Sequence, residues 1–293
     1  MPSKPATSSF LPVLSLLFAA TLWGVIWYPL RLLEQDGLGG VGASLVSYGA
    51  ALVVGLIVSW RARADYVRSP VAFLALALVA GWCNVAFILS VLEGPVVRAL
   101  LLFYLSPLWA ALFGWLFLGE RLSRFALAVL ALAMAGALVM LWNPAAGLHW
   151  PLSRADWLAI SSGMSFALSN VLVRRLQDIS IPVKSVATWG GVVLVAAVWT
   201  ALGDQPLLPV APDVLAGAAV LGLFGIFFMT LAVQYGVTHM PVHRSAVILL
   251  FELVAGAVSS LLLAHEPITA REWLGGLLII AAAYLSARHV QEP

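Results

Sequence analysis

Residues 95–123 read PVVRALLLFYLSPLWAALFGWLFLGERLS, and residues 241–269 read PVHRSAVILLFELVAGAVSSLLLAHEPIT. The two stretches lie 146 positions apart, which is about half of the 293-residue chain. A shift of that length superposes Pro95 on Pro241, Arg98 on Arg244, Ala111 on Ala257, Glu120 on Glu266 and Ser123 on Thr269. Each stretch is an apolar run between polar positions, so the pattern predicts an internal repeat.

The composition indicates a membrane protein. Hydrophobic residues make up 62% of the chain, charged residues only 10%, and the mean hydropathy is +1.03, whereas a soluble domain is about 25% charged. The charged side chains stand at joints between apolar runs and sum to +2, so we expect no nucleic-acid partner. Cys83 is the only cysteine, which excludes an intrachain disulfide.

Apolar runs long enough to cross a bilayer, about 20 residues each, recur along the whole chain. The expected fold is an all-α integral membrane protein with ten transmembrane helices. Their ranges are Phe10–Leu30, Gly40–Trp60, Val71–Leu92, Val96–Leu118, Phe125–Trp142, Asp156–Leu176, Val183–Leu202, Asp213–Val237, Val242–Ala264 and Arg271–Arg288. Pro95 and Pro241 end the third and eighth helices in the pattern.

Five helices in residues 1–146 and five in residues 147–293 make two repeats of opposite orientation, because five is odd. Lysine and arginine in the joints set the orientation. One side holds Lys4, Arg61, Arg63, Arg68, Arg121, Arg124, Arg174, Arg175, Lys184, Arg244 and Arg288, and the other holds Arg31, Arg98, Arg154 and Arg271. The first side holds eleven basic residues and the second holds four, and this excess predicts that both termini are cytoplasmic.

The stretch YLSPLWAALFGW from Tyr104 to Trp115, with LGERLS from Leu118 to Ser123, resembles the drug/metabolite transporter superfamily and, within it, the EamA-type repeat. The resemblance covers the whole chain and implies one EamA-like five-helix repeat in 1–146 and an inverted one in 147–293. The second copy, from Phe251 to Pro267, lacks the helix proline and the glycine of that pattern. We therefore expect its helix to be straighter.

The element Tyr-Leu-x-Pro at Tyr104 to Pro107 is similar to bacterial YddG-type exporters of aromatic amino acids. This resemblance implies a multi-pass secondary transporter of the cell inner membrane that exports amino acids, aromatic ones included. Inverted repeats of this kind alternate access around a midplane site. Ser106 stands where a large aromatic residue is expected, which favours a roomier pocket.

Glu252 is the only strong acid well inside an expected span. A buried carboxylate needs a partner, so Glu252 either couples protons or binds a substrate amine, or it makes a structural hydrogen bond to a neighbouring helix. Polar and aromatic side chains at helical spacing complete the expected substrate site, which comprises Trp23, Trp27, Asn84, Phe87, Tyr104, Ser165, Ser169, Phe227, Thr230 and Glu252. Ser162 and Gln234 share two of these helix faces. The alternatives are helix packing for the serines and lipid contact for the aromatics.

Enzymatic activity has little support, because no catalytic or cofactor motif stands at a credible position. His239 and His243 are separated by Pro241, and we expect no metal site and no cofactor. The spans offer no buried cations for a phosphorylated substrate, since Arg98 and Arg244 are expected to reach solvent from helix ends. Glu120 and Glu266 precede helices, where a carboxylate satisfies free backbone amides, and are interpreted as structural.

Two alternatives to amino-acid export stay open. One is a carrier of the same superfamily for drugs or other metabolites, and the other is a non-transporting membrane protein such as a scaffold or scramblase. The expected partners are a small amino-acid substrate and the lipid bilayer. The coupling ion and the oligomeric state are left open, and a monomer is compatible with the sequence.

Overall fold

The computed structural model describes residues 10–94, 96–142, 153–202, 210–265 and 267–288, and within them it contains helices and turns but no strand. The elements of the first half are α1 (Phe10–Val25), α2 (Trp27–Gln35), α3 (Gly40–Ser59), the 3-10 helix η1 (Trp60–Val67), α4 (Pro70–Glu93), α5 (Val96–Phe103), α6 (Ser106–Leu118) and α7 (Arg124–Leu141). Those of the second half are α8 (Arg154–Arg175), α9 (Ile181–Leu202), α10 (Pro212–Val220), the π-helical turn η2 (Leu221–Ile226), α11 (Phe227–His239), α12 (Val242–Leu249), α13 (Phe251–Leu263) and α14 (Ala270–Arg288).

Helix ends in the two halves correspond under the 146-residue shift. α4 ends at Glu93 and α11 at His239, and α5 and α12 begin at Val96 and Val242. The prediction that these helices end before the two prolines is therefore confirmed. The predicted boundary between the repeats, at 146/147, lies outside the described residues.

Both halves contain a broken helix at the same place. α5 ends at Phe103 and α6 begins at Ser106, while α12 ends at Leu249 and α13 begins at Phe251. The interruption comprises two residues in the first half, Tyr104 and Leu105, and only Leu250 in the second, and the expectation of a straighter second helix stays a prediction. Leu250 has φ −58° and ψ −15°, close to 3-10 geometry, although no proline is present. Tertiary contacts supply the reason: the Tyr104 hydroxyl holds Glu252, and α1 packs on the same turn through Gly24.

Eight helical segments of the described residues are long and apolar enough to cross a membrane. α8 and α14, with 22 and 19 residues, have the length as well, but their composition is more polar. Large apolar side chains cover the outside of the bundle, with Ile57 69% and Phe224 67% exposed. Apolar surface of this extent requires lipid around it, so the protein is an integral membrane protein.

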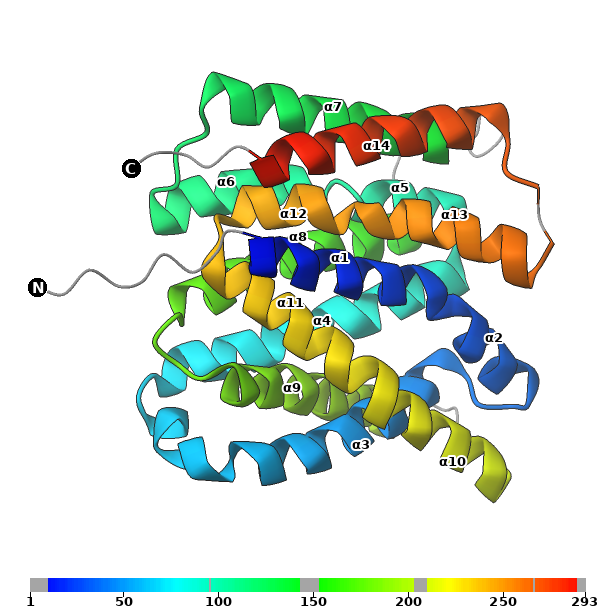
Figure 1. Cartoon of the computed structure of the whole chain (residues 1–293). Coiled ribbons are helices and arrows are strands. Elements are labelled where there is room, and N and C mark those ends of the chain that lie inside the picture. The colour runs from blue at the N-terminus through cyan, green and yellow to red at the C-terminus, as the bar shows by residue number, and fades with distance from the viewer. Residues whose placement is uncertain (1–9, 95, 143–152, 203–209, 266, 289–293) are drawn as a thin grey trace, which may run out of the picture.

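The helices of the two halves interleave. Figure 1 shows α7 and α14 side by side along one edge of the bundle and α3, α9 and α10 along the opposite edge. The α4–α9 crossing depends on Gly191, where a Cβ would lie 1.8 Å from the Ala77 carbonyl oxygen. The α7–α14 pair is equally close, since a Cβ on Gly275 would lie 2.5 Å from the Gly136 carbonyl oxygen.

Most of the basic residues gather at one end of the bundle. α1 begins and α14 ends there (left in Figure 1), and we call this end the basic side and the opposite end the far side. Arg174 donates to the Thr238 carbonyl oxygen, and the Ser180 amide donates to Asp65 at 3.0 Å. These contacts join helix ends that the charge pattern assigns to one side. Lys4, which belongs to the same predicted set, lies outside the described residues.

Candidate functional site

The two helix breaks meet inside the bundle. Tyr104 lies in the break between α5 and α6, is 9% exposed, and donates its hydroxyl hydrogen to Oε1 of Glu252. Glu252 lies in the first turn of α13, directly after the second break. Both residues are in the interior of candidate spans, Arg98–Leu118 and Val242–Leu263. The Glu252 carboxylate and the Tyr104 phenol thus meet where the backbone hydrogen bonding of two helices is interrupted.

Aromatic rings surround this pair. The Phe103 ring lies 5.3 Å from Tyr104, 4.9 Å from Phe87 of α4 and 5.7 Å from Phe166 of α8, measured between centroids. We call Tyr104, Glu252, Phe103, Phe87 and Phe166 the break cluster. Because Gly163 of α8 has no side chain, α8 lies directly against the Phe103 carbonyl, and the rings from three helices come together.

The break cluster has the chemistry to hold an amphipathic cation. A carboxylate at this depth costs several kcal/mol unless it is neutral or paired, and the Tyr104 hydroxyl is its recorded partner. Aromatic faces attract cations and bury apolar groups, so the arrangement suits an ammonium group attached to an apolar body.

A second group of predicted residues forms around Trp189 of α9. Trp189 is fully buried, donates its Nε1 hydrogen to Oγ1 of Thr230 at 3.0 Å, and stacks on Phe227 at 5.1 Å between centroids. Trp23 packs against the same cluster. Asn84 joins it through Tyr48, because Asn84 Nδ2 donates to the Tyr48 hydroxyl oxygen at 3.3 Å. The buried Asn84 Oδ1 atom has no hydrogen-bond partner in the described structure.

The remaining predicted residues make helix-packing contacts or none that is recorded. Trp27 donates to Ser259 Oγ at 2.8 Å, and Ser259 in turn donates to the Gly24 carbonyl oxygen. Ser169 donates to the Phe166 carbonyl oxygen of its own helix. Ser165 is half-buried. The Ser169 bond stays within α8 and joins no second helix. Ser162 donates to the Cys83 carbonyl oxygen of α4, which is the kind of helix-packing contact that the alternative interpretation describes.

Two cations are buried, which corrects the expectation that the spans hold none. Lys184, in the first turn of α9, is fully buried, and its Nζ donates to Oγ1 of Thr238 at 2.5 Å. Arg98 is 7% exposed rather than reaching solvent, because Asp156 at the start of α8 binds it through two hydrogen bonds of 2.5 and 2.7 Å. Spacing along one helix gives no sign of Asp156, since it comes from the other half of the chain.

Glu120 is structural in its contacts, but it serves a different helix from the expected one. Its Oε2 accepts the amide hydrogen of Val242, the first residue of α12, at 2.9 Å. Arg174 Nε lies 3.7 Å from Oε1, and His243 Nδ1 lies 3.7 Å from Oε2. The helix that follows Glu120, α7, is capped by Ser123 instead. Glu266 lies outside the described residues.

A comparison with protein families assigns the chain to a family. The model of the EamA-like transporter family matches the chain twice, over residues 10–142 and 153–288. The chain belongs to the EamA-like transporter family. Membership in a transporter family implies a small-molecule substrate and a lipid environment.

Curated relatives of the EamA-like chain carry transporter names. A probable amino-acid metabolite efflux pump from Escherichia coli is 26% identical over 212 residues, 66% of this chain and 67% of that protein. An uncharacterized transporter from Pseudomonas aeruginosa is 22% identical over 59% of this chain and 57% of its own length. One from Vibrio cholerae is 31% identical over 56% and 54%, respectively. The matched regions therefore span about half to two thirds of these relatives.

The EamA-like fold is also found in a solved crystal structure. It superposes with a TM-score of 0.77 at 17% identity and covers 96% of this chain and 98% of that one. This similarity concerns the fold alone.

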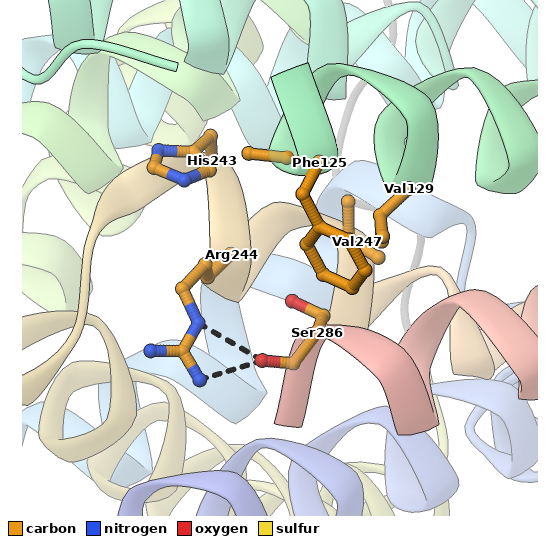
Figure 2. A pocket seen from close by; sticks show the side chains of 7 residues that line it. Phe125, Val129, His243, Arg244, Val247 and Ser286 are labelled. Carbon is orange, nitrogen blue, oxygen red and sulfur yellow. Dashed lines mark hydrogen bonds between the residues drawn. The ribbon is translucent and has the colours of Figure 1, made fainter. Parts of the chain in front are cut away.

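Two surface recesses of the EamA-like bundle lie away from all ten predicted site residues. One lies between α7, α12 and α14 on the basic side and includes Phe125, His243, Arg244 and Ser286 (Figure 2). The other lies between α7, α13 and α14 toward the far side and includes Met140, Val254, Glu272 and Trp273. Neither recess includes a residue of the break cluster, and that site is identified by its chemistry.

Sequence reasoning missed Phe103, Phe166 and Trp189 of the EamA-like interior. Phe103 is next to Tyr104 in the repeated stretch, and its position at the break was a usable signal. Trp189 lies in the middle of an apolar span, Ile181–Leu202, where nothing in the spacing separates an inward ring from a lipid-facing one. The π-helical turn before Phe227 also had no sequence signal, although such turns are frequent at functional sites.

Proposed function

We propose that this EamA-like protein is a secondary transporter that exports amino acids, aromatic ones included, from the cytoplasm. The single observation that carries the proposal is the Tyr104–Glu252 contact at the two repeated helix breaks. Discontinuous helices at the interface of repeats form the substrate sites of many secondary transporters. The name of the Escherichia coli relative supports the substrate class.

The substrate interactions follow from the chemistry of the break cluster. The ammonium group of the amino acid takes the place of the Tyr104 hydroxyl at Glu252, and its side chain lies among Phe87, Phe103 and Phe166. The Trp189 cluster, with Trp23, Phe227, Thr230 and Asn84, extends the lining. The buried Asn84 Oδ1 atom, which lacks a partner in the described structure, accepts a hydrogen bond when the substrate is present.

The proposed transport cycle is alternating access by two inverted five-helix repeats with ten spans, α8 and α14 included. The eight candidate spans and the two remaining long helices give five per half when each broken helix counts once. We also propose that the basic side faces the cytoplasm, with both termini there, in the bacterial inner membrane. The excess of lysine and arginine on that side supports this orientation.

Flux into proteoliposomes tests the proposal. The protein is reconstituted, and counterflow of radiolabelled phenylalanine, tyrosine, leucine and glutamate is measured with and without a pH gradient. We expect aromatic amino acids to exchange. Glu252→Gln should reduce their exchange by about tenfold or more, because a charge-assisted hydrogen bond is worth about 1.5–3 kcal/mol.

The matched control is Glu34→Gln, which makes the same chemical change at an exposed position of α2 and should leave flux unchanged. Thermal unfolding of each variant shows whether folding is retained. Absence of flux for every amino acid, with a folded protein, would favour a carrier of other metabolites. Equal flux in the Glu252→Gln variant at every pH would restrict Glu252 to a structural role.

A further inference from the structure

The recess on the basic side is formed by the last helices of both halves. Its wall is made by Phe125 and Val129 of α7, His243, Arg244 and Val247 of α12, and Ser286 of α14, as Figure 2 shows. The recess is small and partly open to its surroundings. None of these residues belongs to the break cluster.

A buried polar side chain in this wall lacks a partner. His243 is 5% exposed, and neither ring nitrogen makes a hydrogen bond in the described structure. Glu120 Oε2 lies 3.7 Å from Nδ1, beyond hydrogen-bond range, and it is already occupied by the Val242 amide. Buried polar atoms are paired in the great majority of native proteins, so an unpaired imidazole indicates a ligand.

The charge around the recess is positive. Arg244 donates through Nε and Nη2 to the Ser286 carbonyl oxygen at 3.0 and 2.5 Å (Figure 2), and these bonds hold its guanidinium at the wall. Arg124 directly precedes Phe125, and Arg288 lies in the last turn of α14, two residues after Ser286; both are exposed. An anionic group is the complement of this surface.

The surroundings of the recess are apolar and exposed. Leu127 of α7 is 59% exposed and Tyr284 of α14 is 53% exposed, each within one helical turn of a residue in the wall. These surfaces lie on helices that face lipid, and basic pockets between transmembrane helices near the cytoplasmic surface bind anionic head groups. The recess toward the far side provides an internal comparison, because it includes Glu272 and no lysine or arginine.

We propose that the recess between α7, α12 and α14 binds one anionic phospholipid, with its phosphate on His243 and Arg244 and its acyl chains along α7 and α14. Arg124 and Arg288 add attraction at the rim. The phospholipid thereby bridges the final helices of the two repeats. The proposal concerns a lipid and is independent of the transported substrate.

Native mass spectrometry of the full-length protein provides the test. The protein is exchanged into detergent with equimolar phosphatidylglycerol and phosphatidylethanolamine, and the lipids that stay bound are counted. We expect one phosphatidylglycerol to be retained preferentially. The double variant Arg124→Gln, Arg288→Gln should lower this retention by about thirtyfold, since each basic residue near the membrane surface adds about 1 kcal/mol and about 1.4 kcal/mol corresponds to a factor of ten.

The matched control is the double variant Arg61→Gln, Arg63→Gln. Both arginines are exposed on the basic side, and Arg63 lies over the Trp60 ring as Arg288 lies over the Tyr284 ring. It should retain phosphatidylglycerol as the unmodified protein does. A third variant, Ala126→Phe, fills the recess without changing charge and should also lose the lipid while remaining folded by thermal unfolding.

Three results would overturn the proposal. Equal loss in both arginine pairs would mean that surface charge alone attracts the lipid, and retention by Ala126→Phe would mean that the recess is not the site. If excess inorganic phosphate displaced phosphatidylglycerol or raised the melting temperature as much, the recess would be a site for soluble phosphate instead.

Discussion

The Arg98–Asp156 pair ties the two halves together on the far side. Arg98 donates to both carboxylate oxygens, and the two side chains are only 8% and 4% exposed. Asp156 also accepts the Ser153 amide hydrogen at the start of α8. A pair with this geometry satisfies both charges, whereas either partner left alone in the same place would not be satisfied.

We therefore predict that Arg98→Gln destabilises the protein by about 3–5 kcal/mol, the usual cost of leaving a buried charge without its partner. Thermal unfolding in detergent measures the effect. Arg154→Gln is the control, because its pair with Glu93 is 3.4 Å long and largely exposed, and such pairs contribute about 1 kcal/mol or less. Equal losses in the two variants would contradict a buried ion pair.

The residues of the candidate site were predictable to different degrees. Glu252 stood out as an acid inside an expected span, and Tyr104 stood out as part of the Tyr-Leu-x-Pro element. Their mutual contact was not visible, since 148 positions separate them. Ser169 was selected for its spacing, but the same spacing allows a bond to the backbone of its own helix. The spacing in a sequence predicts which residues share a helix face, but it does not predict which residues of another helix they contact.

At the scale of elements, backbone contact between helices depends on single glycines. A Cβ on Gly191 would lie 1.8 Å from the Ala77 carbonyl oxygen, while one on Gly190, a single residue earlier, would lie 3.8 Å from Leu52 Cδ1. The two positions share α9 but differ in what they face. They allow packing to be separated from helix propensity.

Gly191→Ala should accordingly destabilise the α4–α9 crossing by about 1–3 kcal/mol, the usual cost of overpacking. Gly190→Ala should be neutral or stabilise by up to about 1 kcal/mol, because alanine favours the helix. Melting temperatures of the two variants provide the measurement. A similar decrease in both would mean that the crossing is looser than described.

Helix ends were more predictable than helix breaks. Pro95 and Pro241 end helices through a local steric effect that requires no tertiary information. The break at Leu250 has no such residue, and it is stabilised by α1 and by Tyr104. The sequence therefore predicts a break where proline is present and misses one that depends on tertiary contacts.

At the scale of the whole molecule, Cys83 reports on the interface between the halves. It is half-buried on α4, and its Sγ atom lies 3.7 Å from Ser162 Oγ of α8. α4 and α8 belong to different halves of the chain, so the proposed alternating-access cycle should change the exposure of this thiol. As the chain's only cysteine, it can be labelled without background.

We predict that a transported amino acid changes the rate at which a maleimide alkylates Cys83 by severalfold, measured as a mass increase over time in proteoliposomes. In a Cys83→Ser background, Arg61→Cys at an exposed position of η1 on the basic side should react at one rate with or without substrate. If Cys83 also reacted at one rate with every substrate, a non-transporting protein would be favoured.

The two halves differ in the contacts of Arg98 and of its counterpart Arg244, and this difference has an energetic consequence. Arg98 binds Asp156 of the other half, whereas its counterpart Arg244 binds the Ser286 carbonyl of its own half, and Phe10 stands where the shift would place an acid. In the proposed alternating-access cycle, we expect opening of the far side to separate an ion pair for which the basic side has no counterpart. Under that proposal, the two conformations of the empty carrier have unequal populations, and the protein faces one compartment for longer than the other.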